Sequence, residues 1–135
     1  MVWIHGGYFT DGSGTWDAHG PQKYIDTQQV VMVGLLSILK KSAKKTHTKI
    51  FQVTINYRLG PLGFMTIGSE LVQGNQGLYD MIAALEWVQT NIGVLGGDPD
   101  QVTIFGESAG SWGCSYLSVS PLAKVVKYYL ESYLN

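Results

Sequence analysis

The pentapeptide GESAG, at residues 106–110, restricts the possible folds of this chain more than any other stretch. It follows the apolar run QVTIF (101–105), which has the β-branched and aromatic residues of a buried strand, and a helix is expected to begin near Ala109. A serine at a sharp turn between strand and helix has a strained backbone, which lifts its hydroxyl clear of the sheet. The pattern therefore predicts such a turn, with Ser108 as a candidate nucleophile.

Three further apolar runs are expected to form strands, at residues 1–4, 30–33 and 51–57. They are short and unbroken rather than alternating, which is typical of buried parallel strands. An amphipathic helix is indicated before the last strand, by apolar residues at three- and four-residue steps: Leu78, Met81, Ile82, Leu85 and Val88. The alternation of strands and helices predicts an α/β fold, with a mostly parallel sheet and crossover helices.

The composition limits the partners of the chain. Its 135 residues suffice for one domain, and nine basic against ten acidic residues give a net charge of −1, so no overall field favours nucleic acid or a membrane surface. No apolar stretch reaches the ~18–20 residues of a membrane span, and the residues after Met1 lack the order of a signal peptide. The single cysteine excludes an internal disulfide, and the three histidines show no metal-ligand spacing, so we expect no metal and no organic cofactor.

A second glycine-rich stretch, HGGY at residues 5–8, follows the first expected strand. On its own it indicates a turn. Together with the turn at Ser108 it indicates an oxyanion hole, because such a loop can present main-chain N–H groups to the carbonyl oxygen of a substrate. The helix that begins near Ala109 would add one more N–H group and the positive end of its dipole.

Four stretches of the chain resemble, in this order, the type-B carboxylesterases, which are the cholinesterase and carboxylesterase branch of the α/β-hydrolase family: WIHGGYF, TINYRLGPLGF, GNQGLYDMIAALEWVQTNIGVLGGDP and QVTIFGESAG. The resemblance implies that residues 1–135 form an incomplete α/β-hydrolase domain. It also implies hydrolysis of small-molecule carboxylic esters by acyl transfer through Ser108, without a metal or cofactor. A secreted or extracellular location is what the family suggests.

The resemblance assigns roles around Ser108 as well. Gly7, Tyr8 and Ala109 would donate the N–H groups of the oxyanion hole, and Gly6 would shape the loop. The side chain of Tyr8 adds bulk beside the acyl site, where a glycine would leave room. We therefore expect the main chain of this loop to act on the substrate oxygen.

Several other positions have expected roles. Arg58 and Asp80 match positions that form a buried ion pair in relatives, so we interpret them as a structural pair that holds a helix to a strand. Glu107 has two interpretations, a carboxylate that supports the active site or a residue that only forms hydrogen bonds within the turn. Trp87 and Trp112 lie in the expected helices, and we expect both in the core.

The chain departs from the family after Ser108. Relatives keep the triad order serine, acid, histidine, whereas here the only later carboxylate is Glu131 and no histidine follows. We therefore expect residues 1–135 by themselves to be nearly inactive, with the triad acid and histidine in sequence that is not included. Two alternatives stay open: a non-catalytic cell-adhesion relative, against which the intact GESAG counts, and a non-functional fragment.

Two segments interrupt the resemblance, at 34–53 and 125–135. The first begins GLLSILKKSAKKTHTK, which favours a surface amphipathic helix, while a nucleic-acid patch is disfavoured because no aromatic residues interleave. Deleting 34–53 would join VVMV to TINYRLG as one strand, so we interpret 34–53 as an insertion and 125–135 as a divergent tail. A retained intron and a lineage-specific surface insertion are both open as origins.

Overall fold

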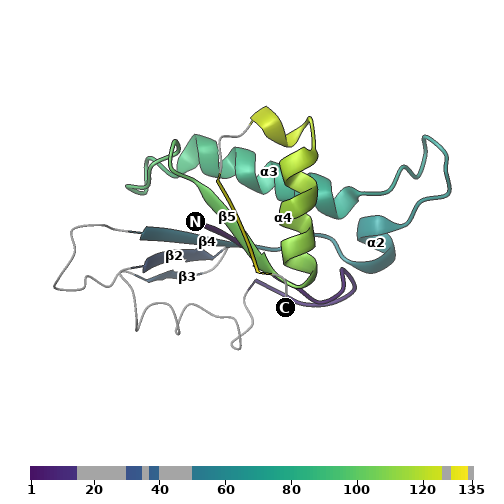
Figure 1. Cartoon of the computed structure of the whole chain (residues 1–135), viewed down its shortest axis with the longest axis horizontal. Coiled ribbons are helices and arrows are strands. Elements are labelled where there is room, and N and C mark those ends of the chain that lie inside the picture. The colour runs from purple at the N-terminus through teal and green to yellow at the C-terminus, as the bar shows by residue number, and fades with distance from the viewer. Residues whose placement is uncertain (15–29, 35–36, 40–49, 126–128, 134–135) are drawn as a thin grey trace.

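The computed structural model describes residues 1–14, 30–34, 37–39, 50–125 and 129–133 (Figure 1). The strands are β1 (Val2–Ile4), β2 (Val30–Gly34), β3 (Ser37–Leu39), β4 (Ile50–Ile55), β5 (Thr103–Glu107) and β6 (Tyr129–Tyr133). The helices are α2 (Gly60–Phe64), α3 (Gln76–Asn91), α4 (Ala109–Val119) and the short 3-10 helix η1 (Ala123–Val125). The strands join in one sheet, in the order β3-β2-β4-β1-β5-β6.

The sheet is mostly parallel. β1 lies between β4 and β5 and is parallel to both, β2 is parallel to β4, and β6 is parallel to β5. Among the described strands, β2 and β3 form the antiparallel pair. α3 connects β4 to β5 and α4 connects β5 to β6, so both long helices are crossovers between parallel strands. The predicted α/β class is therefore confirmed.

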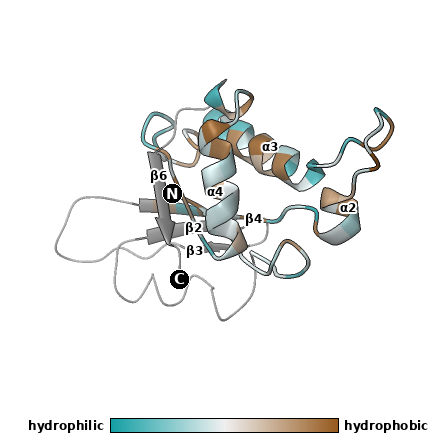
Figure 2. Cartoon of the chain, turned by 45° about the vertical axis from the view of Figure 1, so that its right-hand side comes forward, coloured by the Kyte–Doolittle hydropathy of each residue, from teal (hydrophilic) through white to brown (hydrophobic). Residues whose placement is uncertain are grey.

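The hydrophobic core lies between the sheet and the two long helices. Met81 and Leu85 of α3 and Leu117 of α4 are almost completely buried, and they belong to one cluster with Ile4 of β1. α3 carries both hydrophobic and hydrophilic residues along its length, as expected for an amphipathic helix (Figure 2). β1 is only three residues long and buried throughout, and α4 packs against both β1 and β5.

The two helical tryptophans lie outside this core, and the expectation that they are buried is wrong. Trp87 is 46% exposed and Trp112 is 55% exposed. Each lies next to a buried position, Val88 and Gly113 respectively, and one residue is about 100° around a helix. Both indoles therefore lie on helix faces that the described residues leave uncovered.

One strand ends earlier than its composition predicts, for a reason that the pairing explains. The strand expected at 51–57 is β4, and it ends at Ile55, whose partner Ile4 is the last residue of β1. Beyond this pair, the side-chain oxygen of Asn56 accepts a hydrogen bond from the N–H of Gly14 (2.9 Å). Hydrogen bonds to the side chain of Asn56 thus take over from the main-chain bonds of the sheet once β1 ends.

The two segments that interrupt the resemblance both contribute to the sheet, and 34–53 includes β3 and most of β4. Ser37–Leu39 forms β3, so the helix expected there is wrong; β3 pairs with the last three residues of β2, on the side away from β4. Residues 40–49, the lysine-rich remainder, lie outside the described residues. In the tail, β6 pairs with every residue of β5.

Cys114, on the buried face of α4, should be unreactive in the folded chain. Its thiol is fully buried, and the loss of water raises its pKa to about 12. Because the thiolate is the reactive form, we expect alkylation by iodoacetamide at about pH 8 to be roughly 10³-fold slower than for a free cysteine. Labelling in guanidinium chloride is the control and should be complete; rapid labelling of the folded chain would contradict the burial of this helix face.

Candidate active site

The turn between β5 and α4 holds Ser108 in an unusual backbone conformation. Its φ is 53° and its ψ is −122°, a combination that serine rarely adopts, and α4 begins at the next residue. The helix therefore directs its first main-chain N–H groups, and the positive end of its dipole, at the position of the serine. This is the sharp turn that the sequence predicts.

Two glycines make this turn sterically possible. A methyl group on Gly106 would lie 2.5 Å from the carbonyl carbon of Gly110. One on Gly110 would collide with the carbonyl oxygen of Ile4 and lie 2.8 Å from that of His5. α4 can therefore pack directly on β5 and β1 only because both positions lack a side chain.

The glycine-rich loop that follows β1 lies against this turn. β1 and β5 are parallel neighbours, with Ile4 opposite Gly106, so the chain leaves both strands at the same edge of the sheet. A methyl group on Gly6 would lie 2.7 Å from the Glu107 carboxylate and 3.1 Å from Cβ of Ser108. The structure thus brings together the loop and the turn, two regions about 100 residues apart in the sequence.

The loop itself has three successive residues with positive φ. The values are 109° for Gly7, 55° for Tyr8 and 62° for Phe9. The carbonyl oxygen of Gly7 closes the turn by accepting hydrogen bonds from the N–H groups of Thr10 (2.9 Å) and Asp11 (3.0 Å). Tyr8 is 86% exposed, so little packing of its side chain offsets the cost of its left-handed backbone.

Aromatic side chains fix the loop to the core. The buried hydroxyl of Tyr57 donates a hydrogen bond to the carbonyl oxygen of His5 (2.8 Å), and the two rings stack with centroids 4.4 Å apart. Phe9 contacts the rings of Tyr57 and Phe64, and its carbonyl oxygen accepts a hydrogen bond from the N–H of Gly60 (2.7 Å). Burial raises the pKa of Tyr57, so this phenol remains a donor at every physiological pH.

The main-chain N–H groups expected to form the oxyanion hole are available. Among the described residues, none accepts a hydrogen bond from the N–H of Gly7, Tyr8 or Ala109. The same part of the chain offers no hydrogen-bond partner to Ser108 Oγ. Glu107, the last residue of β5, directs its carboxylate at the backbone of Gly6. These main-chain N–H groups are therefore free to donate to a further acceptor.

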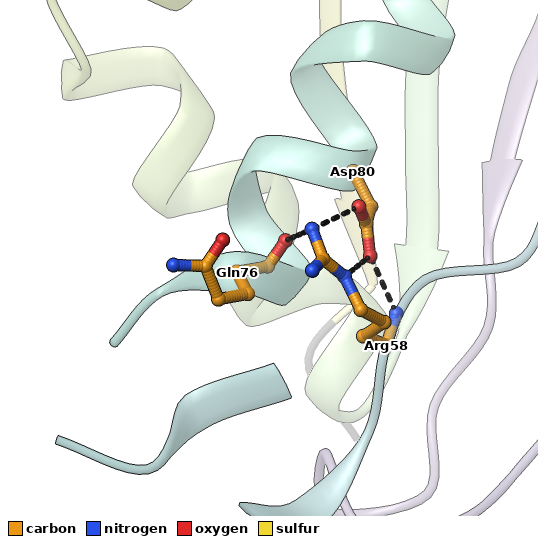
Figure 3. A network of polar contacts seen from close by, with 3 residues as sticks. All are labelled: Arg58, Gln76 and Asp80. Carbon is orange, nitrogen blue, oxygen red and sulfur yellow. Dashed lines mark hydrogen bonds and ion pairs between the residues drawn. The ribbon is translucent and has the colours of Figure 1, made fainter. Parts of the chain in front are cut away.

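Arg58 and Asp80 form the expected pair, but not a buried one (Figure 3). Arg58 Nη2 donates to Asp80 Oδ1 (2.7 Å), while Arg58 Nε and its main-chain N–H both donate to Oδ2 (2.8 Å each). A weaker bond joins Nη2 to the carbonyl oxygen of Gln76 (3.4 Å). The side chains are 51% and 27% exposed, because the pair joins the chain after β4 to the first turns of α3 at the margin of the core. The expectation of burial is wrong, and the effect of breaking the pair is correspondingly smaller.

The hydrogen bonds from Arg58 hold the pKa of Asp80 below its usual value, which gives a pH-dependent contribution to stability. A lowered pKa in the folded state stabilises above the unfolded-state value of about 3.9, and this contribution is lost as the pH falls through the folded-state pKa. We expect Asp80→Asn to lower the melting temperature by a few degrees at neutral pH and by less at about pH 3. Glu86→Gln, at an exposed carboxylate of the same helix, is the control. An equal loss at both pH values would contradict a role for the charge.

Some contributors to this site carry no signal in the sequence. Tyr57 and Phe9 hold the loop, yet nothing local distinguishes them from other aromatic core residues. No group of three or more potential metal ligands occurs within the described ranges. The arrangement that does occur, a strained serine beside free main-chain donors, suits the capture of a carbonyl group by a nucleophile.

Comparison with known proteins gives the same result at the level of the family. The sequence model of the carboxylesterase family matches residues 1–129. The chain belongs to the carboxylesterase family. Acetylcholinesterase-1 of Trittame loki is 42% identical over 98% of the chain, and liver carboxylesterase 1 of Oryctolagus cuniculus is 44% identical over 92%.

Solved structures of esterases share the fold of this carboxylesterase-family chain. A thermophilic pNB esterase has a TM-score of 0.68 at 41% identity over 91% of the chain, and juvenile hormone esterase from Manduca sexta has 0.73 at 35% identity over 97%. The fold is thus a partial α/β-hydrolase fold. The chain spans about a fifth of the length of these relatives, 18% of the liver carboxylesterase and 22% of the pNB esterase.

Proposed function

We propose that this chain is the nucleophile-bearing part of a carboxylic-ester hydrolase in which Ser108 forms the acyl-enzyme. The observation that carries the proposal is the strained backbone of Ser108, which the close packing of Gly106 and Gly110 maintains. Strain of this kind persists where the surrounding structure fixes it, and it is concentrated at active sites. Membership of the carboxylesterase family supports ester hydrolysis as the reaction class.

In the proposed reaction, Ser108 Oγ attacks the carbonyl carbon of the ester while its proton passes to a general base. The carbonyl oxygen becomes an oxyanion and accepts hydrogen bonds from the main-chain N–H groups of Gly7, Tyr8 and Ala109. Collapse of this intermediate breaks the bond to the alcohol, which leaves with the proton, and the acyl group stays on the serine. Water then repeats the sequence on the acyl-enzyme and releases the acid.

The general base and its acid partner are proposed to come from other parts of a longer protein. Relatives are about five times as long as this chain, and no histidine follows Ser108 in it. Loss of a triad member removes most of the rate and leaves ~10³–10⁴ over water from the oxyanion hole and binding. We therefore propose that residues 1–135 alone hydrolyse esters far more slowly than the longer protein.

The loop residues next to the serine suggest two supporting roles. Glu107 contacts Gly6, and we propose that this contact holds the glycine loop at its distance from Ser108. Tyr8 occupies a position where glycine would leave more room, and its exposed ring is proposed to limit the size of the acyl group that can approach. Small carboxylic esters are therefore the proposed substrates.

A fluorophosphonate probe tests the proposal directly. Such probes react with an activated serine hydroxyl and leave a stable adduct of known mass. On the longer protein that contains residues 1–135, we expect one adduct, on the peptide that carries GESAG. Ser118, an exposed serine further along α4, is the internal control and should stay unlabelled. Absence of any adduct on the folded longer protein would overturn the proposal and favour a non-catalytic adhesion role.

The surroundings in which the protein works are also a proposal. None of the described helices is both long and apolar enough to cross a bilayer. The cholinesterase-like resemblance supports secretion of the longer protein, with small esters rather than nucleic acid as its partners. Detection of the longer protein in culture medium, after expression from its natural coding sequence, would support this location.

A further inference from the structure

β2 and β4 are related by a constant offset in the sequence. They are parallel neighbours, and the paired residues run from Val30 opposite Ile50 to Val33 opposite Val53. Every pair is therefore separated by the same twenty positions, which is also the length of the segment 34–53. β4 in turn pairs with β1, where Val53 lies opposite Val2.

This offset allows one strand to take the place of the other. If 34–53 is removed, Val33 joins Thr54 directly, and residues 30–33 fall on the backbone positions of 50–53. Each residue then takes the face of the sheet that its counterpart had, because side chains alternate between faces along the strand and the count back from Thr54 is the same. The sequence VVMV is rich in β-branched residues, which suit a central strand.

One side chain of β4, Gln52, fits poorly in the strand beside β1. Gln52 is 1% exposed, and its amide nitrogen has no hydrogen-bond partner in the described structure. A buried polar group without a partner is destabilising, because it has lost its bonds to water. Met32 is the residue that lies opposite Gln52, and it would bring a side chain of similar length with no amide to satisfy.

The residues after β4 that support the loop are unaffected by such an exchange. Asn56, which accepts a hydrogen bond from Gly14, and Tyr57, which bonds to His5, both follow the point where Val33 would join Thr54. The contacts of the chain with the candidate active site therefore lie outside the exchanged residues.

We propose that residues 30–33 and 50–53 are alternative occupants of the strand position beside β1, and that a chain without 34–53 folds with residues 30–33 there. The proposal does not depend on catalysis. It makes 34–53 dispensable for the central sheet, although this segment contains most of β4.

The test combines the deletion with a reciprocal pair of substitutions. The chain that lacks residues 34–53 should unfold cooperatively. In this deletion variant, Met32→Gln should lower the melting temperature by ~3 °C or more, since it restores a buried amide beside β1. The undeleted chain has its buried amide at Gln52. There, Gln52→Met should raise the melting temperature instead.

The melting temperature of the deletion itself is not the readout. Phe51 packs against the core, and the smaller Val31 would replace it in the deletion variant. The stability lost with this packing opposes the stability gained by removing the buried amide of Gln52. An unfolded or aggregated deletion variant would overturn the proposal, and so would a melting temperature of the deletion variant that Met32→Gln leaves unchanged. Protection of the amides of residues 30–33 from hydrogen exchange in the deletion variant, at the level of β1, would support it.

Discussion

Ser108→Ala in the longer protein is expected to lower kcat/KM for p-nitrophenyl acetate by about 10⁴-fold or more. The substitution removes the only atom proposed to form a covalent bond with the substrate. The fold should be unchanged, because alanine at this position has the same strained backbone and the Ser108 hydroxyl makes no hydrogen bond with the described residues. Initial rates, together with circular dichroism of the variant, give the measurement.

The matched control is Ser118→Ala, on the same helix. Its hydroxyl is exposed and donates only to the carbonyl oxygen of Ser115 (2.7 Å), and at ten residues' distance it lies ~15 Å along α4 from Ser108. It should leave kcat/KM within a factor of two, by our rough expectation for surface changes. A Ser108→Ala protein that keeps its rate within tenfold of the parent would exclude acyl transfer through this serine.

Gly110→Ala is expected to destabilise the chain by about 3 kcal/mol or more. The added methyl group meets main-chain atoms of Ile4 and His5, which cannot rotate away as a side chain can. Relief requires α4 to move off β1, and that movement would also separate the glycine loop from Ser108. Urea unfolding of the variant should show a lower midpoint at an unchanged slope.

Gly93→Ala provides the control for the loss of glycine as such. A methyl group there has no heavy atom within 4 Å, and Gly93 has no positive φ. Its effect should be neutral or slightly stabilising, up to ~1 kcal/mol, through the entropy of the unfolded chain. Equal destabilisation by both substitutions would show that the close contact of α4 with β1 is not what makes Gly110 necessary.

The elements that could be predicted from the sequence are those that local pattern determines. The turn at Ser108 needs only a strand, small residues and a helix in succession, and the buried face of α3 follows from the spacing of Met81 and Leu85. The roles of Gly7 and Tyr8 in an oxyanion hole stay predictions, although their N–H groups are available. Local pattern is thus sufficient for the fold class and for the turn at Ser108, but not for the strand order or for β3 and β6.

Features that depend on distant partners could not be predicted. The burial of a helix face depends on what covers it, which is why the expectation that Trp112 is buried is wrong. The left-handed backbone of Tyr8 and Phe9 gives no signal, since glycine is the residue that ordinarily indicates it. The resemblance predicts that Arg58 and Asp80 pair, but their exposure depends on which residues pack around them.

The hydrogen bond from Tyr57 to His5 has a consequence for how the glycine-rich loop after β1 responds to heat. Binding loops commonly open locally at a small fraction of the free energy needed to unfold the whole protein. Here the loop begins at a residue that is 2% exposed and is joined to the extension of β4 by a buried bond and a stacked ring. The loop that carries the proposed oxyanion donors therefore belongs to the same cooperative unit as the central sheet, and should keep its shape until that unit melts.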